Sequence, residues 1–327
     1  MPHDVCVIGA GWSGLAAATE LQRAGLDVVV VEKARGPGGR CATRRQDGFA
    51  FDHGGQYFTA RSSAFAAAVE DWKRQGLVAA WAPEIHVFGR RPKLGQSSPA
   101  ERLVALPGMN GVLKHLAGSL DCRFGWRAER LVHDGSEWNI HGASGAEPVK
   151  AAQLLLTAPP QQSADLLRGV SGLAERIAAV PMSPCWALML GFEQPLEAGF
   201  DAAFDNDGPL SWLARNSSKP ARDGEAWIAH ASAQWSADHL EAPAEEVARA
   251  LLAAFRSRVP AVAEVPPALL SAHRWRYALA PEPLNEACLV NQSRALVVAG
   301  DWCAGNRIEG AWTSGRAAAE VLSQWRD

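Results

Sequence analysis

The sequence predicts an α/β protein with two domains: one has a mostly parallel sheet, and the other is α+β and built on an antiparallel sheet. Both ends of the chain carry a short apolar strand that runs into a glycine-containing turn and then a helix. Such apolar strands are typical of parallel sheets that helices cover on both faces. The middle of the chain, about 161–289, is rich in Pro and Trp and has one Ala-rich helical stretch near 244–257. We expect this middle part to form most of the second domain.

The composition indicates a globular protein of one large or two modest domains. The chain has 327 residues, 48% of them hydrophobic, and its net charge is −3, so it lacks the basic surplus of nucleic-acid-binding proteins. No apolar run approaches the ~20 residues of a membrane span, and the first residues do not resemble a signal peptide. Six scattered cysteines without a Cys-x-x-Cys pair favour reduced thiols and no metal site. We expect a cytoplasmic protein that binds neither nucleic acid nor membrane.

The first 32 residues carry the fingerprint of a Rossmann-like, dinucleotide-binding domain. Strand 4–8 runs into Gly9-x-Gly11-x-x-Gly14 and a helix over 15–21, and strand 27–32 then ends in Glu32. The first glycine permits the tight turn, the second lets the backbone approach a pyrophosphate, and the third lets the helix pack closely. The helix N-terminus presents N–H groups to the phosphates, and Glu32 is placed to accept hydrogen bonds from ribose hydroxyls.

The segment after the second strand favours FAD over a nicotinamide dinucleotide. Arg35-Gly-Pro-Gly-Gly-Arg40 is a glycine-rich arm that ends in a cation. Nicotinamide dehydrogenases do not normally carry this arm, whereas flavoproteins of the amine-oxidase-like superfamily do. We therefore predict FAD, with Arg40 close to the phosphates or the flavin. We expect the FAD to be noncovalent, because Cys303 does not lie where covalently linked amine oxidases place their cysteine. The FAD contacts expected from this end of the chain are Gly9, Gly11, Trp12, Ser13, Gly14, Glu32, Lys33, Gly39 and Arg40.

Three further segments carry a more specific resemblance. With Phe51-Asp-His-Gly-Gly-Gln-Tyr-Phe58, Pro184-Cys-Trp-Ala-Leu-Met-Leu190 and His273-Arg-Trp-Arg-Tyr-Ala278, the chain resembles bacterial members of the renalase group of FAD-dependent oxidases over nearly its full length. The resemblance implies that the Gly54-Gly55 pair lets the backbone pass close to the flavin ring. It also implies that Gln56 and Tyr57 lie at the edge of that ring.

The C-terminal segment resembles the second FAD signature of the same superfamily. A strand over 294–299 is followed by Gly300-Asp301, a loop and an Ala-rich helix. The resemblance implies that Asp301 bonds the ribityl or phosphate region, and that the closing helix points its N-terminus at the N1–C2=O edge, where its dipole stabilises reduced flavin. The remaining FAD contacts implied by the resemblance are Gly54, Gly55, Gln56, Tyr57, Ala128, Ala158, Gly300, Asp301, Arg307, Ile308 and Glu309.

The two FAD signatures lie at opposite ends of the chain, so we expect a discontinuous FAD-binding domain. Its expected segments are 1–61, 101–160 and 290–327. The expected substrate-binding domain consists of 62–100, predicted to contribute helices, and 161–289.

The renalase group is understood to oxidise the 2- and 6-dihydro isomers of NAD and NADP to NAD(P)⁺ and to pass the electrons to O₂, which forms H₂O₂. The resemblance implies the same reaction here. Loss of hydride to flavin N5 makes the nicotinamide ring aromatic, so no base is required, and we assign no catalytic side chain. Such a substrate requires flat aromatic walls. The expected substrate contacts are Trp186, Arg274, Trp275, Tyr277, Trp302 and Trp312.

Two alternatives remain open. The first is a flavin oxidase of an amine or another small molecule. The lysine that amine oxidases carry after the strand matching 154–158 is missing, because no lysine occurs between Lys150 and Lys219, and the chain has only two tyrosines. The second is a non-catalytic flavin-binding interaction protein, against which the intact motifs at 51–58 and 300–312 count.

Overall fold

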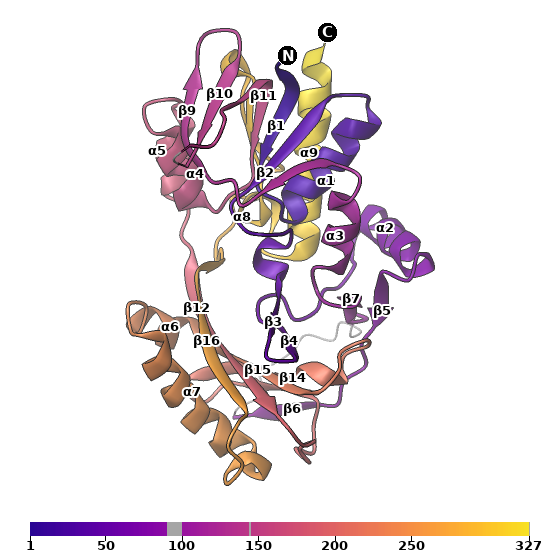
Figure 1. Ribbon diagram of the computed structural model, residues 1–327, viewed down its shortest axis with the longest axis vertical. Helices are drawn as coiled ribbons and strands as arrows, with labels where there is room; N and C mark the ends of the chain where they lie inside the picture. Colours follow the sequence, from indigo (N-terminus) through magenta and orange to yellow (C-terminus); the bar gives the residue numbers. More distant parts are fainter. Residues whose placement is uncertain (90–99, 144, 327) are drawn as a thin grey trace. The chain divides into compact units, whose positions relative to one another are not determined.

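The chain divides into two compact units (Figure 1). The structure is a computed structural model that describes residues 1–89, 100–143 and 145–326. The first unit comprises Met1–Gly39, Val112–Met182 and Leu279–Asp327, and the second comprises Arg40–Gly111 and Ser183–Ala278. Each unit has its own sheet and its own core, which gives a mixed α/β fold with a Rossmann-like domain.

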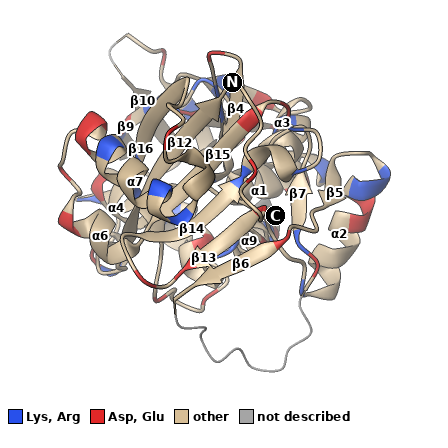
Figure 2. Ribbon diagram, turned by 90° about the horizontal axis from the view of Figure 1, so that it is seen from below, with Lys and Arg blue, Asp and Glu red and all other residues tan. Residues whose placement is uncertain are grey.

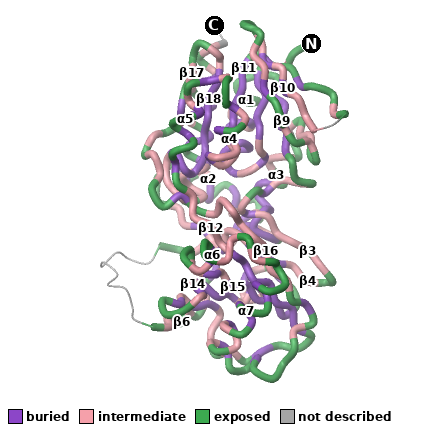
Figure 3. Tube along the Cα trace, turned by 90° about the vertical axis from the view of Figure 1, so that its left-hand side faces the viewer, coloured by how far each residue is buried: buried purple, intermediate pink, exposed green. Residues whose placement is uncertain are grey.

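The first unit is built on a sheet in the order β17-β18-β11-β1-β2-β8, with β10 paired to β11 and β9 to β10. From β18 to β8 all neighbours are parallel. Figure 3 shows most of β11 and β18 as buried, and residues 5–8 of β1 are buried as well, as the apolar sequences of strands covered on both faces predict. The strands are β1 (His3–Ile8), β2 (Val28–Glu32), β8 (Asp121–Phe124), β9 (Ala128–His133), β10 (Trp138–Gly142), β11 (Val149–Leu156), β17 (Leu289–Asn291) and β18 (Leu296–Val298).

Helices α1 and α9 lie side by side in the first unit (Figure 1). A Cβ atom on Gly315 of α9 would lie 2.1 Å from the carbonyl oxygen of Ser13 in α1, so glycine is required for this close approach. The helices of this unit are α1 (Trp12–Arg23), α3 (Gly111–Ala117, whose first residue belongs to the second unit), α4 (Pro160–Leu167), α5 (Leu173–Ala178), α8 (Asp301–Ala304) and α9 (Ile308–Ser323).

The second unit is built on a six-stranded sheet in the order β16-β12-β15-β14-β13-β6. Neighbours β12, β15, β14 and β13 are antiparallel, and β6 joins β13 in parallel. The strands of this unit are β3 (Thr43–Gln46), β4 (Phe49–Asp52), β5 (Val78–Ala80), β6 (Ile85–Phe88), β7 (Leu103–Ala105), β12 (Ser183–Phe192), β13 (Ala202–Asp205), β14 (Leu210–Arg215), β15 (Glu225–Ala231) and β16 (Leu269–Leu279). Its helices are α2 (Ser63–Arg74), α6 (Ala233–Asp238) and α7 (Ala244–Arg258).

Both faces of this six-stranded sheet are covered. Trp227 of β15 packs in the core cluster that holds Leu251 and Phe255 of α7. Ile228, the next residue of β15, packs with Phe51 of β4 in a separate cluster. Because successive side chains of a strand point to opposite faces, helix α7 covers one face and the β3–β4 hairpin covers the other.

The boundaries of the units differ from the predicted domain boundaries. Residues 40–61 and 101–111 belong to the second unit, because the β3–β4 hairpin packs on its sheet through Phe51. Residues 161–182 and 279–289 belong to the first unit, where α4 and α5 contribute to its core. In the range 62–100, predicted to contribute helices, the described residues form one helix, α2, and the strands β5 and β6. Residues 90–99 of that range lie outside the described residues.

The charged surface carries both signs. Figure 2 shows basic and acidic residues together on α2, where Lys73 pairs with Glu70 and Arg74 with Asp71. Among the described residues, no helix is long and apolar enough to cross a membrane. The described part of the chain also holds no group of three or more His, Cys, Asp or Glu side chains that could bind a metal ion.

Candidate cofactor and substrate site

The glycine turn between β1 and α1 has the form that its spacing predicts. Gly9 has φ +112°, a conformation that other residues rarely adopt. A Cβ atom on Gly14 would lie 1.9 Å from the carbonyl oxygen of Gly9, so Gly14 is needed for the helix to pack here. A Cβ atom on Gly11, by contrast, would have no protein atom within 4 Å. Gly11 therefore borders open space at the start of the helix.

The N-terminus of α1 offers unpaired polar groups to a ligand. Its N-cap, Gly11, provides no side-chain cap, and no acidic residue lies in the first turn. The Ser13 hydroxyl is buried and has no hydrogen-bond partner among the described residues. The buried Glu32 ends β2 and accepts hydrogen bonds from the N–H groups of Ala10 and Ala34, both at 2.8 Å. Each of its carboxylate oxygens keeps a lone pair, so these groups fit the pyrophosphate and a ribose of a dinucleotide.

The glycine-rich arm lies against this turn. The N–H of Gly38 donates to the carbonyl oxygen of Ala10 at 3.0 Å, and a Cβ on Gly39 would lie 3.5 Å from the Cα of Gly11. Arg40 follows directly, and its Nη1 donates to the carbonyl oxygen of Ala278 at 3.1 Å within the second unit. The arm thus lies beside the glycine turn between β1 and α1, and its contact with a phosphate stays a prediction.

Four of the other predicted cofactor residues already make protein contacts. Trp12 is buried, and Lys33 is exposed and donates to Oε1 of Gln162 at 3.1 Å. The Gly300 N–H donates to the Ser314 hydroxyl at 3.0 Å, and the carbonyl oxygen of Ala158 accepts from Trp302 Nε1 at 3.2 Å.

The remaining predicted residues of the first unit lie at the starts of secondary-structure elements. Asp301 begins α8 and is buried, and Ala128 begins β9. Arg307 is the N-cap of α9, and Ile308 and Glu309 lie in its first turn. Their contacts to FAD remain predictions.

The Gly54-Gly55 pair has a structural role within the second unit. The Gly55 N–H donates to the carbonyl oxygen of Arg40 at 2.8 Å, and a Cβ on Gly54 would lie 1.9 Å from that oxygen. Gln56 is buried, and its Nε2 donates to the carbonyl oxygens of Asp52 and Gly54. The Gln56 amide therefore stabilises the turn from inside the protein. The half-buried ring of Tyr57 has its centre 5.7 Å from that of Trp212.

An aromatic face forms where β16 meets the residue after β4. The rings of His53 and Trp275 stack with centres 5.0 Å apart, and His273 meets both edge-on, at 4.8 and 4.5 Å. The Trp275 Nε1 donates to the carbonyl oxygen of His53 at 3.0 Å, which holds the indole in place. We call His53, His273 and Trp275 the aromatic face. Tyr277 follows two residues later, on the same side of β16.

The histidines of the aromatic face are held neutral. Burial, together with the neighbouring His273, lowers the pKa of His53 to about 3. Burial and the nearby Arg44 guanidinium also lower the pKa of His273. At neutral pH neither ring carries a charge, and neither is a strong base.

This neutrality predicts how stability depends on pH. The pKa of His53 is about 3 in the folded state and about 6.5 when unfolded, so the unfolded chain binds one more proton between these values. The free energy of unfolding is therefore expected to fall by about 1.4 kcal/mol per pH unit from this residue as pH drops below about 6. Denaturant unfolding at pH 7, 6 and 5 measures this slope. In His53→Asn the free energy of unfolding should fall less steeply with decreasing pH, by the contribution of one bound proton. An unchanged slope would contradict the lowered pKa of His53.

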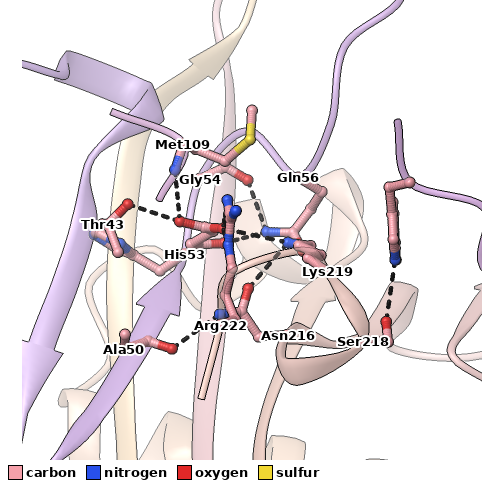
Figure 4. Close-up of polar contacts among 12 residues, drawn as sticks. Thr43, Ala50, His53, Gly54, Gln56, Met109, Asn216, Ser218, Lys219 and Arg222 are labelled. Atoms are coloured by element: carbon pink, nitrogen blue, oxygen red, sulfur yellow. Dashed lines mark hydrogen bonds and ion pairs between the residues drawn. The ribbon is translucent and has the colours of Figure 1, made fainter. Parts of the chain in front are cut away.

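The structure contains a buried charged cluster that the sequence does not predict (Figure 4). The side chains of Asp52, Lys219 and Arg222 have exposed fractions of 0%, 0% and 1%. Arg222 donates to Oδ2 of Asp52 through Nε at 3.1 Å and Nη2 at 2.8 Å, and Lys219 Nζ lies 3.7 Å from the same oxygen. We call these residues the buried cluster. Its only signal in the sequence is a lysine and an arginine three positions apart, which alone does not predict burial.

The structure places three of the predicted substrate contacts away from the aromatic face. Arg274 Nη1 donates to the Glu241 carboxylate at 2.8 Å, because Arg274 alternates with Trp275 on β16 and points to the opposite face of the sheet. Trp186 is 2% exposed in the core under α7. Trp302 has no exposed surface, because it packs in the core of the first unit. None of the three side chains presents a surface for substrate on the predicted aromatic wall.

Trp312 lies on α9, and its ring faces the Arg316 guanidinium at 4.8 Å. Its contact with substrate stays a prediction. The side chains of Trp275 and Tyr277 lie on one side of β16.

Two family models match the sequence. Residues 7–72 match the NAD(P)-binding Rossmann-like domain, and residues 62–323 match the model described as flavin containing amine oxidoreductase. The zeta-carotene-forming phytoene desaturase of Myxococcus xanthus is 54% identical over 50 residues, 15% of this chain and 10% of that protein. The hydroxyneurosporene desaturase of Rubrivivax gelatinosus is 45% identical over 69 residues, 20% of this chain and 13% of that protein. The matches thus span only a small part of the length of these relatives.

Solved structures resemble the whole chain. Cyclohexylamine oxidase from Brevibacterium oxydans IH-35A has a TM-score of 0.76 and 16% sequence identity, with 99% of both chains covered. A putrescine oxidase bound to putrescine has a TM-score of 0.71 and 16% identity, with 98% of this chain and 99% of the other covered. These likenesses show a shared fold.

Proposed function

We propose that this chain, which belongs to the family of flavin-containing amine oxidoreductases and has FAD as its cofactor, oxidises dihydronicotinamide isomers. In this reaction a 2- or 6-dihydro isomer of NAD or NADP gives a hydride to the flavin and leaves as NAD(P)⁺. O₂ then takes the two electrons and forms H₂O₂.

The observation that carries this proposal is the neutral aromatic face. An alkyl amine is protonated at neutral pH and must lose a proton before it can be oxidised. His53, with a pKa of about 3, is too weak a base for that task, and the pKa of His273 is lowered as well. A dihydronicotinamide becomes aromatic when it loses hydride, so it needs no base. The half-buried ring of Trp275, with His53 stacked behind it, also suits a flat substrate.

Most of the residues that we propose to bind FAD lie in the first unit. When bound, FAD supplies the hydride acceptor and the route of electrons to O₂. Gly11, Ser13 and the α1 N-terminus are proposed to bind its pyrophosphate, and Glu32 a ribose hydroxyl. In the second unit, the turn at Gly54 and Gly55 is proposed to border the flavin ring.

Amine oxidation is the second candidate, because the matched family model is described by that activity. The full-length likeness to cyclohexylamine oxidase, at 16% identity, extends to the fold alone.

The decisive test is anaerobic. Purified protein is mixed separately with a 6-dihydro-NAD isomer, ordinary NADH and a panel of amines while the flavin absorbance is followed. We expect the isomer alone to bleach the flavin rapidly, and air to restore the colour with formation of H₂O₂. Bleaching by an amine and not by the isomer would replace the proposal with the second candidate. A firmly bound flavin that nothing bleaches would contradict both.

A pair of neighbouring substitutions tests the aromatic face. Trp275→Ala removes the stacking wall and is expected to raise KM for the isomer roughly tenfold, which corresponds to a stacking contribution of about 1–3 kcal/mol. Arg274→Ala is the matched control, because its side chain points to the opposite face of β16 and pairs with Glu241. Steady-state kinetics of both variants measure the difference. If Arg274→Ala raised KM and Trp275→Ala did not, Arg274 and not Trp275 would be the substrate contact.

A further inference from the structure

The buried cluster carries an excess positive charge. It contains two cations, Lys219 and Arg222, and one carboxylate, Asp52, and the exposed fraction of each side chain is 1% or less. Charges removed from water normally occur in matched pairs, because an unmatched one costs several kcal/mol. Arg222 is already matched to Asp52 by two hydrogen bonds. Lys219 shares this carboxylate at a longer distance, 3.7 Å from Nζ to Oδ2, so the buried cluster keeps one positive charge in excess.

The surroundings of Lys219 are nevertheless arranged for an ammonium group. Its Nζ donates to Oδ1 of Asn216 at 3.0 Å and to Oε1 of Gln56 at 3.1 Å. Asn216 Nδ2 donates to the carbonyl oxygen of Ala50, so its oxygen is turned toward the lysine. The Gln56 amide is oriented in the same way by its two backbone acceptors. The ring of Trp81, centred 5.5 Å from Nζ, adds a cation–π contact.

The cluster is also linked to the turn at Gly54. Gln56 connects them, because its oxygen accepts from Lys219 while its Nε2 donates to the carbonyl oxygens of Asp52 and Gly54 (Figure 4). A field from Lys219 therefore acts on the segment that is proposed to border the flavin.

We propose that Lys219, held charged inside the buried cluster and joined to the Gly54 turn through Gln56, is a positioning residue that raises the reduction potential of the bound FAD. A flavin that accepts electrons gains negative charge, and a nearby positive charge in a water-poor interior favours that state. The excess positive charge of the buried cluster would, in this view, be balanced by the reduced cofactor. The inference rests on the proposed position of the flavin but not on the identity of the substrate.

The proposal predicts a dependence on pH. Burial and the Arg222 charge, opposed by Asp52, lower the pKa of Lys219 to about 8. The charged and titratable groups that face it are Asp52 of β4, Arg222 of the segment before β15, and His230 of β15, whose pKa burial lowers to about 4. Of these groups only Lys219 changes charge near pH 8. The reduction potential should therefore fall more steeply with pH above about 8 than below it.

The experiment measures the flavin midpoint potential of the holoenzyme against a reference dye, without substrate, from pH 6.5 to 9.5. Lys219→Met is expected to shift the reduction equilibrium at pH 7 at least tenfold toward oxidised flavin, about 30 mV for a two-electron couple. It should also remove the break near pH 8. Lys219→Arg keeps the charge at every pH, so its potential at pH 7 should stay near wild type without a break.

Lys73→Met is the matched control, because it removes an equally charged side chain that pairs with Glu70 and Glu101 on the surface of the same unit. Equal potentials for Lys219→Met and Lys73→Met would overturn the proposal, as would a wild-type profile with no break near pH 8. The wild-type profile and Lys219→Arg decide the question if Lys219→Met does not fold. Failure of dihydronicotinamide isomers to bleach the flavin would contradict the proposed function only, because the potential is measured without them.

Discussion

Asp52→Ala is expected to lower the free energy of unfolding by about 3–5 kcal/mol, the cost of breaking a buried ion pair by removing one partner. The substitution leaves the buried Lys219 and Arg222 without a counter-ion. It also removes the acceptor of the Thr43 hydroxyl at 2.7 Å and of the Met109 N–H at 2.9 Å. Thermal unfolding of the purified holoenzyme measures the loss.

Glu70→Ala is the control for Asp52→Ala, because Glu70 pairs with Lys73 on the surface and such pairs contribute about 0–1 kcal/mol. A loss no larger than that of the control would show that the buried cluster is not a major source of stability. Asp52→Asn, which keeps the shape of the side chain, provides the measurement if Asp52→Ala does not accumulate as folded protein.

The Asp52 carboxylate is also expected to make the folded protein less stable at low pH. Burial by itself would raise the pKa of Asp52, but Lys219 and Arg222 hold it below its ordinary value. Its contribution to stability is therefore complete above about pH 4, the unfolded pKa, and is lost as pH falls through the lower folded value.

Gly14→Ala and Gly11→Ala are expected to separate folding from cofactor binding. The new methyl on Gly14 would lie 1.9 Å from the Gly9 carbonyl oxygen and 2.9 Å from Thr157 Oγ1, so helix α1 must shift. We expect this overpacking to cost roughly 1–3 kcal/mol of stability and to abolish retention of FAD. The new methyl on Gly11 has no protein atom within 4 Å and occupies the space proposed for the pyrophosphate.

Gly11→Ala should therefore keep the stability of the FAD-free protein and bind FAD at least roughly tenfold more weakly. Circular dichroism follows unfolding, and flavin absorbance after gel filtration follows retained FAD. If Gly11→Ala retained FAD as well as the wild type, the proposed pyrophosphate position would be wrong. If Gly14→Ala unfolded as the wild type does, the helix would be able to yield at this contact.

Much of the first unit could be predicted because its signals are local. A glycine in a left-handed turn, a helix that starts three residues later and an acid at the end of the next strand lie within 32 residues, and the structure has β1, α1 and β2 close to the predicted bounds. The strand and helix near the C-terminus were predicted for the same reason. In each case a short segment carries both its own conformation and the chemistry of the site.

The tertiary structure decided the features that depend on distant partners. Asp52 and Lys219 are 167 positions apart, and nothing near either residue signals that both are buried side by side. Alternation along β16 places Trp275 and Arg274 on opposite faces, but only the packing of the β3–β4 hairpin and α7 shows which face meets the aromatic residues and which meets Glu241. The sequence by itself determined the dinucleotide turn, because backbone geometry over a few residues governs it. The class of cofactor followed from the resemblance to amine-oxidase-like flavoproteins. Burial, charge pairing and the unit boundaries required the tertiary structure, because they are set by which distant segments exclude water from one another.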